Sequence, residues 1–170
     1  MKTISEQMGF YEAYHRNPWN KATHFVGIPA IIFALLLLLS WLSVTAGSVT
    51  VTAAMVFTVA VMAYYVALDR VMAGVMVVLI GPLLFAAHQA AQWPWQEGLA
   101  IFLATFVGGW ILQLIGHTVF EKRRPAFTDN LIQLLIGPLF FAAEILFFLG
   151  FKRELQAEVR RLAMLAGAPG

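Results

Sequence analysis

The chain contains no cysteine, and charged side chains make up only 12% of its 170 residues. The lack of thiols excludes disulfides, cysteine-ligated zinc, iron–sulfur clusters and thiol nucleophiles, so a bound metal needs histidine, carboxylate or water ligands. Charge is scarcest between residues 22 and 120, where only Asp69, Arg70 and Glu97 carry it. Soluble domains have about 25% charged residues, whereas 61% of this chain is hydrophobic. The composition therefore predicts a membrane protein.

Five apolar segments fill most of the chain, and each is close to the roughly 20 residues with which a helix crosses a bilayer. They span residues 22–44, 49–68, 71–88, 98–118 and 131–150. Residues 151–166 alternate charged and apolar side chains at helical spacing, which indicates an amphipathic helix at the membrane interface. We expect an all-α fold, with residues 1–170 forming one integral membrane domain: a polytopic helical bundle of four to five hydrophobic segments with interfacial helices at both ends.

Basic residues gather beside the apolar segments, so they predict orientation in a membrane and argue against nucleic acid as a partner. With a cytoplasmic N-terminus, three groups face the cytoplasm: Lys2, Arg16 and Lys21, then Arg70, then Lys122, Arg123 and Arg124. Five crossings would put the basic tail on the opposite side, so we favour an even number of crossings. We expect a multi-pass protein of a bacterial inner membrane or an ER-type membrane. Membrane lipids are its expected partners, and an oligomer is compatible with the sequence.

Two histidines flank the start of the first apolar segment, in the sequence YHRNPWNKATH. These are His15 and His24, and ionisable side chains at such positions are candidates for function. Asn17 followed by Pro18 is typical of a helix N-cap and the first helical residue. A helix that begins there brings Asn17, Asn20 and His24 close together, with His15 just before it.

A polar stripe lies at the end of the fourth segment, where Gln113, His117 and Glu121 are spaced four residues apart on an otherwise apolar helix. The start of the first segment and the end of the fourth lie at the same membrane face, so His15, His24, His117 and Glu121 can converge. Three imidazoles without thiolates suit divalent iron or zinc in a hydrolytic or oxygen-using centre. The alternative is that each histidine is a hydrogen-bonded interfacial anchor.

Several other polar residues have simpler interpretations. His88 lies near two tryptophans at the opposite face and is predicted to be an interfacial anchor. Glu144 either pairs with a neighbouring polar group or is a buried acid with a raised pKa. The basic run 122–124 either anchors the chain at anionic lipid or clamps a substrate carboxylate. An aromatic belt is expected at Tyr11, Tyr14 and Trp19.

Two segments together resemble a known family. Residues 9–20, GFYEAYHRNPWN, with His24, and the motif G-H-x-x-x-E-K-R-R-P-A that begins at residue 116 are similar to the small multispanning Fe(II)-dependent 2-hydroxy fatty acid dioxygenases of fatty-acid α-oxidation. The likeness runs over nearly the whole chain, and the histidines that the family requires fall on His15, His24 and His117. The resemblance implies that Fe(II) bound by these histidines uses O₂ to convert a long-chain 2-hydroxy fatty acid into a fatty acid one carbon shorter.

The resemblance also suggests roles for the neighbouring residues. Arg123 or Arg124 would hold the substrate carboxylate. Glu121 or Gln113 would orient a ligand imidazole, unless Glu121 is itself a ligand. Supporting positions around the ligands are Asn17, Asn20 and Gln113. The site would open near the cytoplasmic face. Two other functions are compatible with the residues: a different histidine–metal membrane hydrolase or hydroxylase acting on lipids, and a non-enzymatic small transporter or lipid-binding scaffold.

Overall fold

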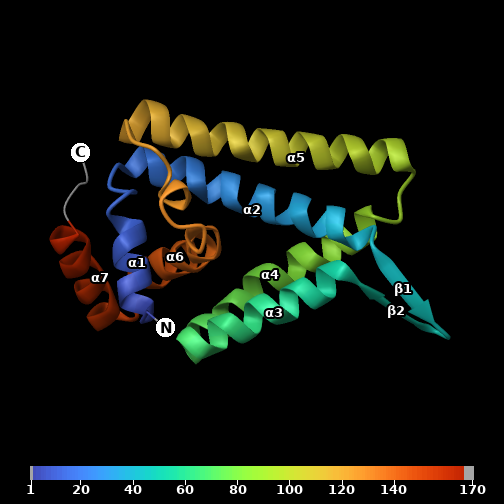
Figure 1. The fold of residues 1–170 in the computed structure, drawn as a ribbon, viewed down its shortest axis with the longest axis horizontal. Coiled ribbons are helices and arrows are strands. Elements are labelled where there is room, and N and C mark those ends of the chain that lie inside the picture. Colours follow the sequence, from blue (N-terminus) through green and yellow to red (C-terminus); the bar gives the residue numbers. More distant parts are fainter. Residues whose placement is uncertain (1, 167–170) are drawn as a thin grey trace. The chain divides into compact units, whose positions relative to one another are not determined.

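The computed structural model describes residues 2–166, and helices dominate it (Figure 1). The α-helices are α1 (Ile4–Glu12), α2 (Pro18–Ser40), α3 (Ala53–Leu68), α4 (Arg70–Ala90), α5 (Trp95–Ile115), α6 (Gln133–Phe148) and α7 (Arg153–Leu165). A π-helix, η1 (Gly116–Glu121), directly continues α5, and a 3-10 turn, η2 (Ala126–Thr128), precedes α6. The predicted all-α class is confirmed, although a short β-hairpin joins α2 to α3.

The described chain divides into two compact units. The terminal unit contains the described parts of Met1–Phe25 and Leu112–Gly170, and the central unit is Val26–Ile111. The prediction of one integral membrane domain over the whole chain stays a prediction.

Three of the described helices are long and apolar enough to cross a membrane: Pro18–Ser40, Arg70–Ala90 and Trp95–Glu121, the last combining α5 and η1. Helices α3 and α6 are shorter, with 16 residues each. All five predicted apolar segments are helical over most of their length, but two of their boundaries fall inside the hairpin. The apolar helices agree with the predicted membrane protein.

The hairpin pairs β1 (Ser43–Ala46) with β2 (Val49–Thr52) and was not predicted. Valine and threonine alternate through this stretch, and β-branched residues favour strands over helices. Gly47 supplies the turn with φ of 61°, a left-handed conformation that suits glycine. Seven of the eight strand residues are exposed, so side-chain burial contributes little to this element.

Local capping determines where four of the helices begin. A side-chain oxygen accepts a hydrogen bond from a backbone N–H of the first turn, and it comes from Thr3 for α1, Asn17 for α2, Thr52 for α3 and Asp69 for α4. Such a cap satisfies one of the N–H groups that a helix start leaves without a partner. The predicted Asn17 cap and Pro18 helix start are therefore confirmed.

In the terminal unit, α7 packs its apolar face against α1. Val159 and Ala163 are 2% and 3% exposed. A Cβ atom at Gly9 would lie 2.7 Å from the Cβ of Leu162, so only glycine permits this close approach. The amphipathic helix predicted over residues 151–166 is thus present, and protein covers the centre of its apolar face.

An ion-pair cluster joins three helices of the terminal unit. Lys21 Nζ lies 3.0 Å from Glu12 Oε2 and 3.2 Å from Glu144 Oε2, and it also lies over the Phe140 ring. Of the two interpretations of Glu144, pairing with a neighbour is therefore the one observed. Burial raises the pKa of the Glu12 carboxyl, and the Lys21 ammonium opposes that shift.

In the central unit, α5 approaches α2 through a glycine. A Cβ atom at Gly109 would lie 2.7 Å from Ile31 Cγ1 and 3.0 Å from the carbonyl oxygen of Gly27. Any larger residue at position 109 would push the two helices apart.

Candidate metal centre

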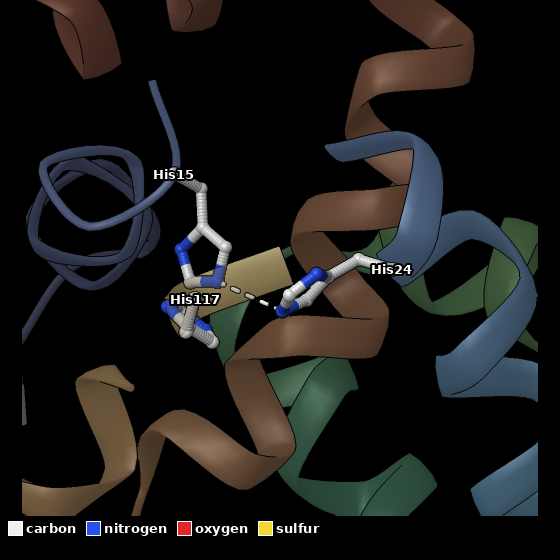
Figure 2. A group of neighbouring side chains, drawn as sticks. All are labelled: His15, His24 and His117. Atoms are coloured by element: carbon white, nitrogen blue, oxygen red, sulfur yellow. Dashed lines mark hydrogen bonds between the residues drawn. The ribbon is translucent and has the colours of Figure 1, made fainter. Parts of the chain in front are cut away.

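Three histidines from three separate elements converge in the terminal unit (Figure 2). His15 lies in the turn between α1 and α2, His24 in the second turn of α2, and His117 in η1. They are 2%, 5% and 2% exposed. One ring nitrogen from each lies within 4.8 Å of the others. The structure thus brings together the three histidines that the sequence singled out.

Backbone carbonyls fix the orientation of two of the rings. His15 Nδ1 lies 2.8 Å from the carbonyl oxygen of Tyr11, and His24 Nδ1 lies 2.8 Å from that of Asn20. A carbonyl oxygen only accepts hydrogen bonds, so in each neutral ring Nδ1 carries the proton. In both rings Nε2 is then left with a free lone pair.

These two lone pairs face each other, because His15 Nε2 lies 3.2 Å from His24 Nε2. Two acceptors at this distance repel unless a proton or a metal ion lies between them. Burial lowers the pKa of His15 well below its usual value, and the neighbouring His24 and His117 lower it further, so a proton is disfavoured. A metal ion bound by both nitrogens would remove this repulsion.

The donor set fits a divalent transition metal. Two imidazole nitrogens that bind one ion at about 2.0–2.1 Å and at right angles lie about 3 Å apart, close to the 3.2 Å observed. The three rings are also nearly perpendicular to one another, with interplanar angles of 79°, 75° and 81°. Imidazole suits iron, zinc, copper and nickel, so the geometry indicates a metal without choosing among these four.

His117 lies where the geometry of the helix changes. Regular α-helix ends at Ile115, and the chain widens into a π-helix over Gly116–Glu121. Short π-helical segments inside α-helices are frequent at functional sites. Gly116 packs so closely on α2 that a Cβ atom there would overlap the side chains of Asn20 and Thr23. This glycine therefore allows His117 to come within reach of His24.

Tyr11 supports the centre in a way that the sequence interpretation missed. Its ring stacks on His15 at 3.8 Å with an interplanar angle of 6°, and its carbonyl holds His15 Nδ1. Tyr11 and Tyr14 are 6% and 3% exposed, so the predicted aromatic belt is wrong for both, whereas Trp19 is 66% exposed. The four-residue spacing of Tyr11 and His15 on one helical face was the available signal.

The comparisons with known proteins agree with this geometry. A family model described as 2-hydroxy-palmitic acid dioxygenase Mpo1-like matches residues 1–149. The chain belongs to this family. The 2-hydroxy-palmitic acid dioxygenase MPO1 of Saccharomyces cerevisiae is 36% identical over 155 residues, which cover 91% of this chain and 86% of the yeast protein. No solved structure matches the chain. The family resemblance drawn from the two sequence motifs is thus confirmed.

Glu121 is hydrogen-bonded to the start of α2. Its carboxylate accepts hydrogen bonds from the backbone N–H groups of Arg16 and Asn17, at 3.0 and 2.9 Å, and from Asn20 Nδ2 at 3.0 Å. The Asn20 carbonyl in turn accepts from His24 Nδ1. Glu121 therefore supports the imidazoles indirectly, and all three of its described hydrogen bonds lead to α2 or the turn before it.

We expect Glu121→Gln to weaken metal binding by about 10- to 100-fold, the usual effect of changing a residue that orients metal ligands. The amide keeps only one acceptor oxygen and points an N–H group at backbone donors. Competition with a metal-sensitive dye measures the affinity, and Glu97→Gln, at an exposed position in the first turn of α5, is the matched control. If Glu121→Gln binds metal as tightly as the wild type, the contact of Glu121 with the start of α2 serves helix packing alone.

The basic run after η1 is held by protein contacts. Arg123 Nη1 donates to the carbonyl of Ala13 at 2.8 Å, and its guanidinium lies over the Tyr14 ring. The Tyr14 hydroxyl donates to Asp129, which also pairs with Arg124 at 2.9 Å. Substrate binding by the two arginines stays a prediction.

The other predicted supporting residues also lie in the terminal unit. Asn17 Nδ2 donates to the carbonyl of Phe120 at 2.9 Å and so joins α2 to η1. Gln113 lies one turn before His117 and is 8% exposed. His88 lies in the last turn of α4 and is not among the converging histidines.

Proposed function

We propose that the chain is an Fe(II)-dependent dioxygenase that converts long-chain 2-hydroxy fatty acids into fatty acids one carbon shorter. The overall reaction consumes one O₂ and releases the carboxyl carbon as CO₂ together with one water. The observation that carries the proposal is the pair of His15 and His24 lone pairs, which face each other at 3.2 Å beside His117. The yeast relative, a 2-hydroxy-palmitic acid dioxygenase, supports the choice of substrate class.

In this proposal, His15, His24 and His117 hold the iron. Bound Fe(II) would supply one-electron chemistry toward O₂, which protein side chains do not offer. The carbonyls of Tyr11 and Asn20 keep both Nδ1–H groups turned away, so that the Nε2 atoms stay available as ligands. Burial of the three rings keeps bulk water away from the ligand atoms.

The proposed substrate is amphiphilic, and the sequence offers a place for each of its ends. The fatty tail would lie among the apolar helices, and the polar head would stay near the cytoplasmic face, where the positive-inside count places residues 15–24 and 117–124. Arg124 is well suited to meet an incoming carboxylate, because its side chain is 68% exposed although it pairs with Asp129.

Oxygen dependence tests the proposal. We expect purified, Fe(II)-loaded protein to convert 2-hydroxypalmitic acid into the C15 fatty acid in air, with one O₂ consumed per product, and to form no product under nitrogen. Mass spectrometry measures the acids, and an oxygen electrode measures the gas. Palmitic acid, which lacks the 2-hydroxyl group, is the matched control and should not react.

Two outcomes would contradict the proposal. Product formation under nitrogen would indicate a hydrolytic centre, and full activity with zinc in place of iron would exclude redox chemistry at the metal. A protein that binds no iron and leaves the acid unchanged would favour the transporter or scaffold alternative.

A further inference from the structure

Gln113 is a buried amide with an unused hydrogen-bond donor. The residue is 8% exposed, and within residues 2–166 its Nε2 atom has no hydrogen-bond partner. Buried amide groups are nearly always paired, because losing water without gaining a partner is unfavourable. An unpaired donor at this depth therefore indicates a partner that the protein itself does not supply.

The position of Gln113 on its helix directs it toward the histidine centre. On α5 it lies four residues after Gly109 and three before Gly116, so the three residues share one face. Each glycine packs against α2: Gly109 approaches Gly27, and Gly116 approaches Asn20, Thr23 and His24. Within the terminal unit, Gln113 lies one turn before Gly116 on the same helix face, which packs on the first turns of α2, where His24 lies.

The kind of group that Gln113 Nε2 can bind follows from its being an amide nitrogen. An amide nitrogen donates hydrogen bonds and has no free lone pair, so a metal ion cannot satisfy it. Within residues 2–166, Asn20 Oδ1 and His117 Nδ1 are also buried without partners, and so are Thr58 Oγ1, His88 Nδ1 and Gln133 Oε1 on other helices. Gln113, Asn20 and His117 lie on the helical segments that carry His24 and His117, as expected of a subsite for polar groups of a ligand. An anionic oxygen is the acceptor that a buried N–H binds most strongly.

We propose that Gln113 Nε2 donates a hydrogen bond to the carboxylate of the bound 2-hydroxy acid and so selects acids over neutral lipids. This inference rests on the proposed function and adds a residue that contacts the substrate. It also assigns Gln113 a different role from the one that the sequence suggested, which was to orient an imidazole.

A binding experiment without turnover tests the contact. Fe(II)-loaded protein in detergent is titrated under nitrogen with 2-hydroxyhexadecanoic acid and, separately, with hexadecane-1,2-diol, which keeps the hydroxyl and the chain but lacks the carboxylate. We expect Gln113→Leu to weaken binding of the acid by about 10- to 100-fold, the value of a hydrogen bond to a charged group. Binding of the diol should change less than about 3-fold, because that ligand has no carboxylate to lose.

Two further variants serve as controls. Gln113→Glu keeps the size and polarity of the side chain and should weaken binding of the acid at least as much, since two carboxylates repel. Thr105→Val removes a hydroxyl from the same helix whose hydrogen bond stays within that helix, and it should bind both ligands like the wild type. Iron content and the midpoint of thermal unfolding, measured for every variant, report on the centre and on the fold.

The possible failures can be told apart. Equal losses for acid and diol, or no loss for either, would overturn the carboxylate contact while leaving an iron-loaded, active wild type intact. Loss of iron in both Gln113 variants would show that the residue positions His117 instead. A wild type that binds no iron would overturn the proposed function, and this contact with it.

Discussion

Replacing any one of His15, His24 and His117 by alanine is expected to abolish stoichiometric iron binding and O₂-dependent turnover. Three converging imidazoles leave no spare ligand, and the Cys-free chain offers no thiolate to take the place of a lost nitrogen. We expect about one iron per chain in the wild type and a loss of affinity of at least about 100-fold in each variant. Elemental analysis after removal of loosely bound metal measures the iron content.

His88→Ala is the matched control, because this imidazole lies near the end of α4, outside the group that converges. The control should retain both iron and turnover. Full metal occupancy in His117→Ala, or loss of iron in His88→Ala alone, would contradict the assignment. Circular dichroism of each variant separates the loss of a ligand from the loss of the fold.

The sequence singled out the three histidines that converge because they occupy unusual positions. His24 and His117 lie near the ends of long apolar segments, and His15 lies shortly before the first of these segments. The predicted membrane topology puts the start of the first segment and the end of the fourth at one face, so convergence could be expected without knowledge of side-chain geometry. The family resemblance added iron and the substrate class, which residue spacing alone does not determine.

The details that make these histidines a metal centre depend on tertiary contacts. The π-helix that carries His117 and the close packing of Gly116 on Asn20 are not visible in hydrophobic periodicity. The belt interpretation of Tyr11 failed because a tyrosine beside an apolar segment fits both an interfacial position and a buried one. The hairpin after Ser40 was missed because its valines extend the apolar run while their branching favours strands.

The number of crossings depends on α6, and the terminal unit places this helix beside α1. Gln133, at the start of α6, donates to Gln7 at 3.4 Å, and Glu144, near its end, pairs with Lys21. Between them, Phe140 packs on Tyr11 with ring centroids 4.9 Å apart. A single face of α6 thus contacts the N-terminal segment along most of its length. That segment precedes the first predicted span, so we expect it to stay at one face of the membrane.

Length agrees with this conclusion but does not separate α6 from α3, because each helix has 16 residues and is about 24 Å long, shorter than the roughly 30 Å of hydrocarbon that a spanning helix must cross. The contacts with the N-terminal segment are what distinguish α6. The ion pair of Glu144 with Lys21 would be unfavourable deep in lipid and is well accommodated at an interface. We therefore expect α6 to lie at the cytoplasmic interface without crossing. The basic tail then stays on the cytoplasmic side, and the number of crossings is even, as the positive-inside rule requires.

Single cysteines on either side of α6 test this topology, since the chain has no native cysteine to give a background. Thr128 precedes α6, Ala157 follows it on α7, and both are exposed. In cells or sealed vesicles, an impermeant thiol reagent should modify Thr128→Cys and Ala157→Cys from the same side. Gln92→Cys, in the exposed connector between α4 and α5, should react only from the other side. Opposite labelling of positions 128 and 157 would mean that α6 crosses the membrane. It would then separate Glu144 from Lys21, and the packing of the terminal unit around the three histidines would be wrong.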